Sequence, residues 1–370
     1  MKVLITGGAG FIGSHTADLL LEKGYEVRVL DNLEPPVHPR KKKPDYLSED
    51  VEFIPGDVRS KNDLEKALQG ADYVFHLAAY QGYLTDFGKF AFTNDGSTAL
   101  IYEVIVEKEL PVRKIILGSS QAVYGEGKYH CAEHGIQYPS SRSLEQLERG
   151  EWEVKCSVCQ QLMEPLPSNE SKVNPHNQYA VSKYCQELYA LTLGKRFGIP
   201  TVVLRYSITQ GSRQSFYNAY SGILRIFATR LLHNLPPVIY EDGEQLRDYV
   251  YVGDVAAANI LALESEAANY EIYNIGGTEV LSVSQYAKRL LRVLGKDTIP
   301  EIPGEFRFGD VRHIISDISK IKKLGWQPRT SLEQIISEYL EWVMEQPELR
   351  DFNVEASRVM KQMGVIRAIR

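Results

Sequence analysis

The sequence predicts an α/β fold: a doubly wound parallel β-sheet with a smaller α/β second lobe. Two observations predict it. Short runs of aliphatic and β-branched residues alternate with helical patterns over the first 205 residues, and some runs are apolar without interruption, as in strands that helices cover on both faces. Beyond residue 205 polar loops with tyrosine and proline lead to two long helical patterns.

The elements follow in order along the chain. Strands of the parallel sheet are expected at residues 3–6, 26–30, 51–54, 73–77, 114–118 and 201–205, with an amphipathic helix across 17–23 and second-lobe helices at 284–293 and 331–344. We therefore expect a first domain at 1–205, to which about 240–275 return, a second lobe at 206–239 and 276–345, and a tail at 346–370 without an assigned purpose. Residues 126–172 form an insertion in the first domain.

Composition excludes several classes of protein. The chain has 370 residues, 44% of them hydrophobic and 24% charged, which is typical of a globular protein. Its formal charge of −6 argues against a general nucleic-acid partner, which requires a basic face. No apolar run reaches the length of about 18 residues that a membrane-spanning helix needs, and no signal peptide is expected. The sequence thus favours a cytoplasmic protein without a membrane partner.

Glycines at the first strand-to-helix turn indicate a dinucleotide site of the Rossmann type. Gly8, Gly10 and Gly13 follow the pattern G-x-G-x-x-G, and Gly7 adds a second glycine spacing on the same turn. Bare backbone there lets a pyrophosphate approach the free N–H groups of the helix start. Asp31 ends the second strand, 31 − 13 = 18 residues later, where a carboxylate accepts from a ribose 2′-hydroxyl and repels a 2′-phosphate. NAD is therefore predicted, while the basic run at 40–43 leaves NADP open.

Two further strand ends fit a bound dinucleotide. Asp57 follows the third strand and is either an adenine contact or a turn former. Ala78 and Ala79 follow the fourth strand and let the backbone lie close to a cofactor, or simply pack.

Tyr179 and Lys183 are four residues apart on a predicted helix, so both side chains share a face. A neighbouring ammonium lowers the pKa of a phenol, which allows the tyrosine to act as a base. The alternative is a pair that only covers a helix surface. Ser119 and Ser120, which follow the fifth strand, favour the catalytic interpretation because a hydroxyl there faces the crevice at the strand ends.

These motifs carry a family resemblance. The chain resembles the extended short-chain dehydrogenase/reductases, and within them the nucleotide-sugar epimerase/dehydratase branch, over residues 1 to about 344. The matching segments are 6–13 (TGGAGFIG), 31–32 (DN), 57–58 (DV), 76–79 (HLAA), 119–125 (SSQAVYG), 179–183 (YAVSK) and 247–252 (RDYVYV).

The resemblance implies roles for individual residues. It makes Tyr179 the base that abstracts a sugar hydroxyl proton while hydride passes to the nicotinamide. It has Lys183 lower the phenol pKa and hold the nicotinamide ribose, and Ser120 hydrogen-bond the reacting hydroxyl. The implied cofactor residues are Gly7, Gly10, Phe11, Ile12, Gly13, Asp31, Asn32, Asp57, Val58, Leu77, Ala78, Ala79, Asn94, Ser119, Tyr179, Lys183 and Tyr206, and the implied substrate residues are Ser120, Asn218, Arg247 and Arg307. A homodimer is also implied.

The segment after the fifth strand narrows the reaction. Sugar 4,6-dehydratases of this family carry an Asp-Glu pair where this chain has Gln121 and Ala122, and neither of these can titrate. A 4-epimerase needs only reversible oxidation at C4 and return of the hydride to the other face. We therefore expect a nucleotide-sugar 4-epimerase that acts through a transient 4-keto intermediate. A 4,6-dehydratase or 4-reductase on the same scaffold, and a catalytically silent NAD-binding protein, are the alternatives.

The substrate segments are similar to those of dTDP-rhamnose and UDP-glucose type 4-epimerases, with the residues at 205–206 and 218–223 most like the rhamnose type. The two arginines suit a diphosphate because a guanidinium grips two oxygens at once. Two positions depart from the family pattern. Ile208 stands where the family commonly carries asparagine, and Gln81 where galactose-type epimerases place a lysine.

The insertion carries a candidate metal site. Cys131 and His134, then Cys156 and Cys159, are two pairs with two intervening residues each, a spacing that lets each pair reach one metal ion. Gln160 replaces the glycine that usually follows such a second pair. A structural zinc and reduced cysteines without a metal both remain open at this stage.

Overall fold

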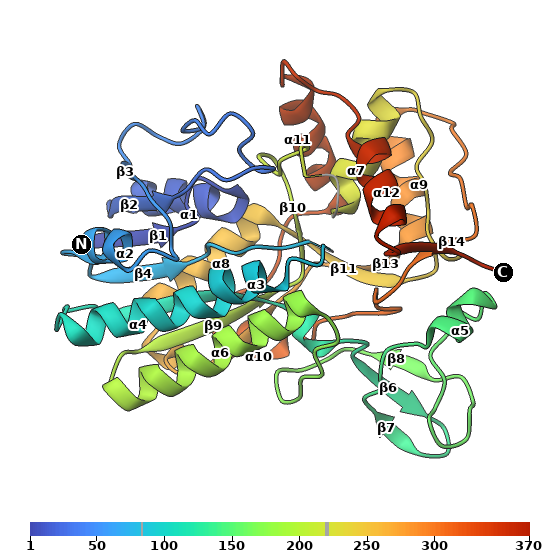
Figure 1. The fold of residues 1–370 in the computed structure, drawn as a ribbon, viewed down its shortest axis with the longest axis horizontal. Coiled ribbons are helices and arrows are strands. Elements are labelled where there is room, and N and C mark those ends of the chain that lie inside the picture. Colours follow the sequence, from blue (N-terminus) through green and yellow to red (C-terminus); the bar gives the residue numbers. More distant parts are fainter. Residues whose placement is uncertain (83, 219–221) are drawn as a thin grey trace.

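A seven-stranded, all-parallel sheet forms the main body of the molecule (Figure 1). The computed structural model describes residues 1–82, 84–218 and 222–370. In spatial order the strands are β12 (Ile272–Ile275), β9 (Thr201–Tyr206), β5 (Lys114–Ser120), β4 (Tyr73–His76), β1 (Lys2–Thr6), β2 (Glu26–Asp31) and β3 (Glu52–Pro55). The predicted doubly wound sheet is confirmed, and its order reverses direction between β1 and β4, where such sheets bind ligands.

Helices cover both faces of this sheet, which explains the uninterrupted apolar strands. The helices are α1 (Phe11–Glu22) and α8 (Val252–Glu264) on one face, and α2 (Lys61–Leu68), α4 (Ser97–Glu107) and α6 (Gln178–Phe197) on the other. Short helical elements complete the domain: α3 (Phe87–Phe90), η1 (Ala91–Gly96), η2 (Gln121–Tyr124), η3 (Glu266–Ala268) and α10 (Ser319–Lys322). The longest helix, α6, begins at the Asn177 cap and ends at Gly198 in the left-handed conformation.

The second lobe is built around a small sheet and three helices. Its elements are β10 (Ile208–Gln210), β11 (Leu246–Tyr251), β13 (Val280–Ser282), α7 (Ile223–Leu232), α9 (Val283–Leu294) and α11 (Leu332–Met344). The two predicted helices are confirmed, and each begins at a serine capping box. Strand β11 pairs with β10 and β13, and Tyr249 packs into this lobe's core. The chain therefore returns to the main sheet through α8 and β12. This return begins later than residue 240, where the sequence predicted it, because β11 belongs to the second lobe.

The insertion folds as a separate small unit at the lower right of Figure 1. It contains β6 (Lys128–Cys131), β7 (Gly135–Gln137), α5 (Leu144–Glu148) and β8 (Glu164–Leu166), with the strands paired antiparallel in the order β7-β6-β8. Its own apolar core is small and includes Tyr129, Val154 and Met163.

The tail is an integral part of the second lobe. It forms α12 (Asn353–Gln362) and β15 (Ile366–Ala368), and β15 pairs antiparallel with β14 (Glu305–Arg307), so that Ile366 lies opposite Arg307. A strand this short has no periodicity from which to predict it. Within the described residues, no helix is both long enough and apolar enough to cross a bilayer.

Candidate active site

One cavity of about 1040 Å³ runs from the carboxyl ends of the main strands to the second lobe. This volume exceeds the usual range for a single small ligand, which is about 300–1,000 Å³. Residues of β2 and β5 and of the turns that follow β1 and β4 line one part of it, and residues from α7, β11, β14 and β15 line the other. The cavity therefore has room for two ligands.

The glycine turn forms a tight cradle at one end of this cavity. Gly7 has a φ of 70°, and a Cβ on it would lie 2.7 Å from the Ala78 Cα. A Cβ on Gly13 would lie 2.4 Å from the Gly7 carbonyl oxygen. Only glycine fits at either position, and the first-turn amides of α1 have no carbonyl partners within the helix. This cradle fits the pyrophosphate of a dinucleotide.

Asp31 lies beside the cradle at the end of β2. Its carboxylate accepts hydrogen bonds from the Ala9 N–H at 3.1 Å and the Leu33 N–H at 2.9 Å. Burial raises its pKa, and these two hydrogen bonds oppose that shift. The basic run points elsewhere: Arg40, Lys42 and Lys43 pair with Glu348, Asp45 and Glu49, and none of the three lines the cavity. The arrangement suits a ribose 2′-hydroxyl better than a 2′-phosphate.

Most of the predicted cofactor residues line the cavity, and two do not. Asp57 pairs with Arg59, whose hydrogen bond lowers the carboxyl pKa to about 2, and it also accepts from Asn32. Asn94 is buried behind the cavity wall, where its amide bonds the backbone of Tyr80 and the Ser182 hydroxyl. The lining residues are Gly7, Gly10, Phe11, Ile12, Gly13, Asp31, Asn32, Val58, Leu77, Ala78, Ala79, Ser119, Tyr179, Lys183 and Tyr206.

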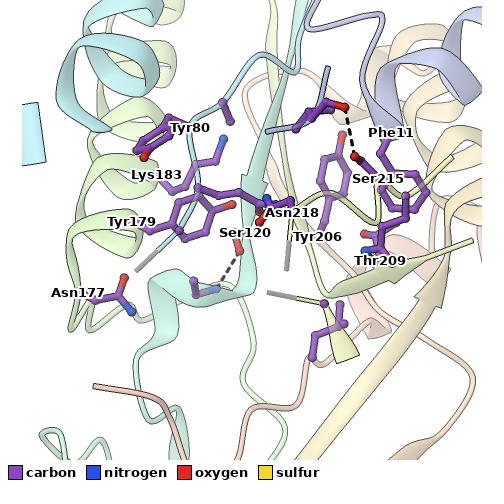
Figure 2. Close-up of a pocket in the computed structure, with 18 of the residues that line it drawn as sticks. Phe11, Tyr80, Ser120, Asn177, Tyr179, Lys183, Tyr206, Thr209, Ser215 and Asn218 are labelled. Carbon is purple, nitrogen blue, oxygen red and sulfur yellow. Dashed lines mark hydrogen bonds between the residues drawn. The ribbon is translucent and has the colours of Figure 1, made fainter. Parts of the chain in front are cut away.

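Tyr179, Lys183 and Ser120 come together at the middle of the cavity (Figure 2). The Lys183 ammonium donates to the Gly118 carbonyl at 2.7 Å and to Gln186 Oε1 at 2.8 Å. The pKa of Tyr179 is raised to about 12. Burial causes this rise, and a hydrogen bond with the Ser120 side chain opposes it. Burial lowers the pKa of Lys183 to about 7, and the Glu187 carboxylate opposes that shift.

A buried ion pair supports these three residues, and the sequence reading missed it. Glu187 lies one turn after Lys183 on α6 and accepts two hydrogen bonds from Arg205, at 2.9 and 2.6 Å. It also accepts the Ser119 hydroxyl at 2.6 Å, while Arg205 donates to the Tyr124 hydroxyl at 2.9 Å. Both charged side chains are almost fully buried. The signal in the sequence is Glu187, four residues after Lys183 and therefore on the same buried face of the helix.

Arginines gather at the other end of the cavity. Arg247 donates to the carbonyls of Arg312 at 2.8 Å and Val311 at 2.6 Å, and Arg307 stacks 4.9 Å from the Tyr240 ring centre. Both predicted arginines line the cavity, as does Asn218; residues 219–221 of the matching segment lie outside the described part of the chain. Arg225 of α7 and Arg367 of β15 also line it and were not predicted.

The departures from the family pattern also lie on the cavity wall. Ile208 and Gln81 line it, so an apolar side chain and an uncharged amide stand on the cavity wall at these two positions. Gln121 and Ala122 line it beside Ser120, and Gln121 Oε1 accepts from the Ser316 hydroxyl at 3.1 Å. Among the described lining residues the acids are Asp31, Glu34 and Asp310. The first two flank the end of β2, and Asp310 lies 3.8 Å from Arg247.

The fold, the glycine cradle and the Ser-Tyr-Lys group define a dehydrogenase-type enzyme that binds a nicotinamide dinucleotide. Comparison with known proteins agrees. The model of the NAD dependent epimerase/dehydratase family matches residues 3–143 and 159–276, and the chain belongs to this family. The match is interrupted at 144–158, inside the insertion.

Individual relatives are nucleotide-sugar enzymes. The chain is 33% identical to dTDP-L-rhamnose 4-epimerase of Burkholderia thailandensis, over 93% of this chain and 95% of that one. It is 31% identical to a putative UDP-glucose 4-epimerase of Methanocaldococcus jannaschii, over 92% of this chain and 98% of that one. The crystal structure of Thermotoga maritima UDP-glucose 4-epimerase with UDP-glucose is similar with a TM-score of 0.77 at 32% identity, covering 93% and 99%. The crystal structure of UDP-glucuronic acid 4-epimerase from Bacillus cereus in complex with NAD has a TM-score of 0.73 at 27% identity, and the match covers 93% of this chain and 99% of that one.

We predict that Glu187→Gln destabilises the protein by about 3 kcal/mol, because it removes the charge that neutralises the buried Arg205. Urea unfolding of the two proteins measures this. Glu107→Gln is the control, since its ion pair with Lys61 is exposed to water and should contribute little to stability. Equal effects of the two substitutions would contradict the role given to the buried pair.

Proposed function

We propose that this chain is an NAD-dependent nucleotide-sugar 4-epimerase, which inverts C4 of an NDP-hexose through a transient 4-keto intermediate. The observation that carries the proposal is the Ser120, Tyr179 and Lys183 group, set between a dinucleotide cradle and an arginine-lined pocket, with an uncharged glutamine and alanine at positions 121 and 122. Bound NAD would supply the hydride acceptor and donor at C4. The chain's own residues supply binding and proton transfer.

Tyr179 is the proposed base, and it needs a negative phenolate to accept the proton of the C4 hydroxyl. Burial opposes that charge, so the neighbouring groups must favour it. The Ser120 hydroxyl does so by donating to the phenolate, and we assign the same effect to the charge of Lys183, one turn along the helix. The same phenol returns the proton when the ketone is reduced, which gives no net change in the base.

Epimerisation requires the 4-keto sugar to turn over between oxidation and reduction, so the enzyme should grip the substrate away from the sugar ring. The arginine end of the cavity suits this need because guanidinium groups bind diphosphate oxygens in pairs. We assign Arg247, Arg307 and Asn218 to the diphosphate end. Ile208 places an apolar side chain on the cavity wall where the family commonly carries asparagine, and an isoleucine cannot hydrogen-bond a diphosphate.

The sugar and the base are inferred from the relatives alone. Two relatives are a dTDP-L-rhamnose 4-epimerase and a putative UDP-glucose 4-epimerase, and we propose an NDP-hexose of one of these types. A panel of dTDP- and UDP-hexoses assayed for C4 inversion by product NMR tests the proposal. A stable 4-keto product would indicate a 4,6-dehydratase, net consumption of reduced cofactor a 4-reductase, and no turnover with any sugar a silent NAD-binding protein.

Tyr179→Phe should lower kcat by at least about 10²–10⁴-fold, the usual contribution of a general base, and should leave NAD bound. Product NMR gives the rate, and absorbance of the released dinucleotide gives the cofactor content. Tyr184→Phe, on the same helix and outside the described cavity lining, is the control and should retain full activity. Substantial epimerisation by Tyr179→Phe would remove Tyr179 from its assigned role.

Ser120→Ala should move the acidic limb of the pH–kcat profile to higher pH. The base works only when deprotonated, so activity is lost as the pH falls through the phenol pKa. Because the Ser120 hydrogen bond lowers that pKa, its removal raises the pH at which activity appears. A profile measured from pH 5 to pH 10 tests this, and a limb that stays in place or moves to lower pH would show that Ser120 does not act on the phenol.

We further propose a homodimer that forms through α6. The side chains of Val181, Leu188 and Tyr189 recur at helical spacing on one exposed face, and α4, with exposed Val106, runs alongside (Figure 1). An apolar stripe of this kind on a water-exposed helix marks an interaction surface. The cytoplasmic location stays a prediction from the sequence.

Leu188→Glu should shift the protein from dimer to monomer, because it places a charge in the centre of the apolar stripe. Light scattering coupled to size exclusion measures the mass over a range of concentrations. Ile299→Glu, at an exposed isoleucine outside the stripe, is the matched control and should leave the mass unchanged. A monomeric wild type would refute the proposed dimer.

A further inference from the structure

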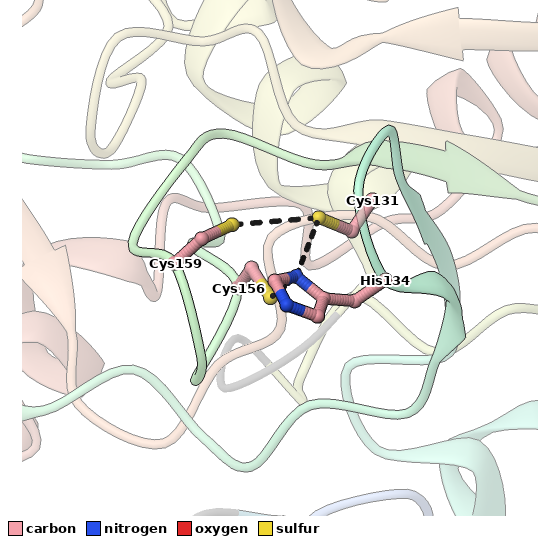
Figure 3. A group of neighbouring side chains, drawn as sticks. All are labelled: Cys131, His134, Cys156 and Cys159. Carbon is pink, nitrogen blue, oxygen red and sulfur yellow. Dashed lines mark hydrogen bonds between the residues drawn. The ribbon is translucent and has the colours of Figure 1, made fainter.

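Two turns of the insertion bring four ligand side chains together (Figure 3). Cys131 ends β6 and His134 lies in the turn to β7, while Cys156 and Cys159 lie in a second turn before β8. His134 Nδ1 is 3.6 Å from Cys131 Sγ and 3.6 Å from Cys156 Sγ, and Cys131 Sγ is 3.6 Å from Cys159 Sγ. All four ligand atoms lie within 4.8 Å of one another.

The three separations of 3.6 Å match those between the ligands of a tetrahedral zinc site. Zn–S bonds of about 2.3 Å and Zn–N bonds of about 2.0–2.1 Å at tetrahedral angles place ligand atoms about 3.6–3.8 Å apart. A disulfide between Cys131 and Cys159 would instead need the sulfurs about 2.05 Å apart. We propose that Cys131, His134, Cys156 and Cys159 bind one structural Zn²⁺, and that this ion holds the insertion in the position from which it supports the substrate pocket.

The backbone of the second turn has the form that the site needs. The Gln160 N–H donates to the Cys156 carbonyl at 2.9 Å, and the Cys156 N–H donates to the Gln161 carbonyl at 2.8 Å. Gln160 has a φ of 61°, the left-handed conformation that a glycine adopts most easily. The replacement of that glycine therefore leaves the turn intact.

The insertion also needs a cross-link. Its core contains few apolar residues besides the cysteines, among them Tyr129, Val154 and Met163. A unit with so small a core rarely stays folded by apolar burial alone, and a structural metal is a common remedy. Because no ligand position would stay open, the ion would contribute stability and no chemistry.

A buried ionic network joins the insertion to the second lobe. From the insertion, Arg142 donates two hydrogen bonds to Glu241, each 2.9 Å long, and one to Glu126 at 3.3 Å. From the second lobe, Arg312 donates to Glu153 at 3.0 Å and to Glu241 at 3.0 Å. Glu153 stands three residues before the zinc ligand Cys156, so the turn that the ion fixes also fixes this carboxylate.

The same network reaches the substrate pocket. The Arg312 N–H donates to Glu126 at 2.7 Å, and its carbonyl accepts from Arg247 at 2.8 Å. Arg247 is thereby held with its guanidinium on the cavity wall. Loss of zinc should loosen Glu153, then Arg312, and finally Arg247, so that substrate affinity falls while NAD binding at the far end of the cavity does not. This last step rests on the proposed function, whereas zinc binding does not.

Metal analysis of the full-length protein by mass spectrometry should find one zinc per chain. Cys156→Ser and His134→Ala should lose it, whereas Cys185→Ser, at the cysteine outside the cluster, and His130→Ala, at an exposed histidine beside Cys131, should retain it. Wild-type protein without zinc, or with a Cys131–Cys159 disulfide in peptide mapping, would overturn the proposal.

Cobalt substitution of the wild type keeps the test decisive if the variants fail to fold. Protein exchanged with Co²⁺ should show the intense visible bands of tetrahedral cobalt and the near-ultraviolet bands of thiolate coordination. Octahedral spectra, or no bound cobalt, would overturn the site.

Enzyme kinetics then show whether the zinc ion positions Arg247 for substrate binding or only stabilises the fold. Chelated enzyme that stays folded should show a KM for the nucleotide sugar raised about tenfold, the factor of one hydrogen bond to a charged group, with kcat and NAD content unchanged. Zinc should restore the KM. An unchanged KM after full zinc removal would overturn the link to Arg247, while a lack of turnover in the zinc-loaded wild type would count only against the proposed function.

Discussion

The buried pair between Glu187 of α6 and Arg205 of β9 is the interaction on which the active centre depends. It fixes α6 against the carboxyl ends of the central strands, and through Ser119 it also fixes the end of β5. One turn earlier on the same helix, Lys183 reaches the Gly118 carbonyl. The helix is therefore held to the sheet at two points, one and two turns after Tyr179, and the proposed base can face Ser120 from a rigid element.

Burial acts on the two titratable groups of this centre in opposite directions. It raises the pKa of the Tyr179 phenol and lowers the pKa of the Lys183 ammonium, so both neutral forms are favoured. The Ser120 and Glu187 side chains oppose these shifts at the tyrosine and the lysine respectively. The chemistry at C4 thus depends on neighbours that restore charge within a buried site, and each of those neighbours comes from a different structural element.

Sequence reasoning captured what is local. The glycine cradle, Asp31 and the Tyr179–Lys183 spacing each lie within one turn or one helix, and the structure places all of them on the cavity. It did not place side chains whose position depends on a particular partner. Asp57 is held by Arg59 two residues along the chain, the Asn94 side chain is held behind the cavity wall by Tyr80, and Arg367 lies on the cavity in β15, which pairs with β14. No pattern in the sequence predicts such contacts.

The proposed epimerisation requires a hydride to leave C4 of the sugar and to return to the same carbon. Incubation with UDP-glucose and dTDP-rhamnose that carry deuterium at C4, followed by NMR of the products, tests it most directly. The expected result is inverted product that keeps its deuterium at C4, with no exchange into water. Deuterium loss to solvent with inversion, or accumulation of a 4-keto sugar, would contradict it.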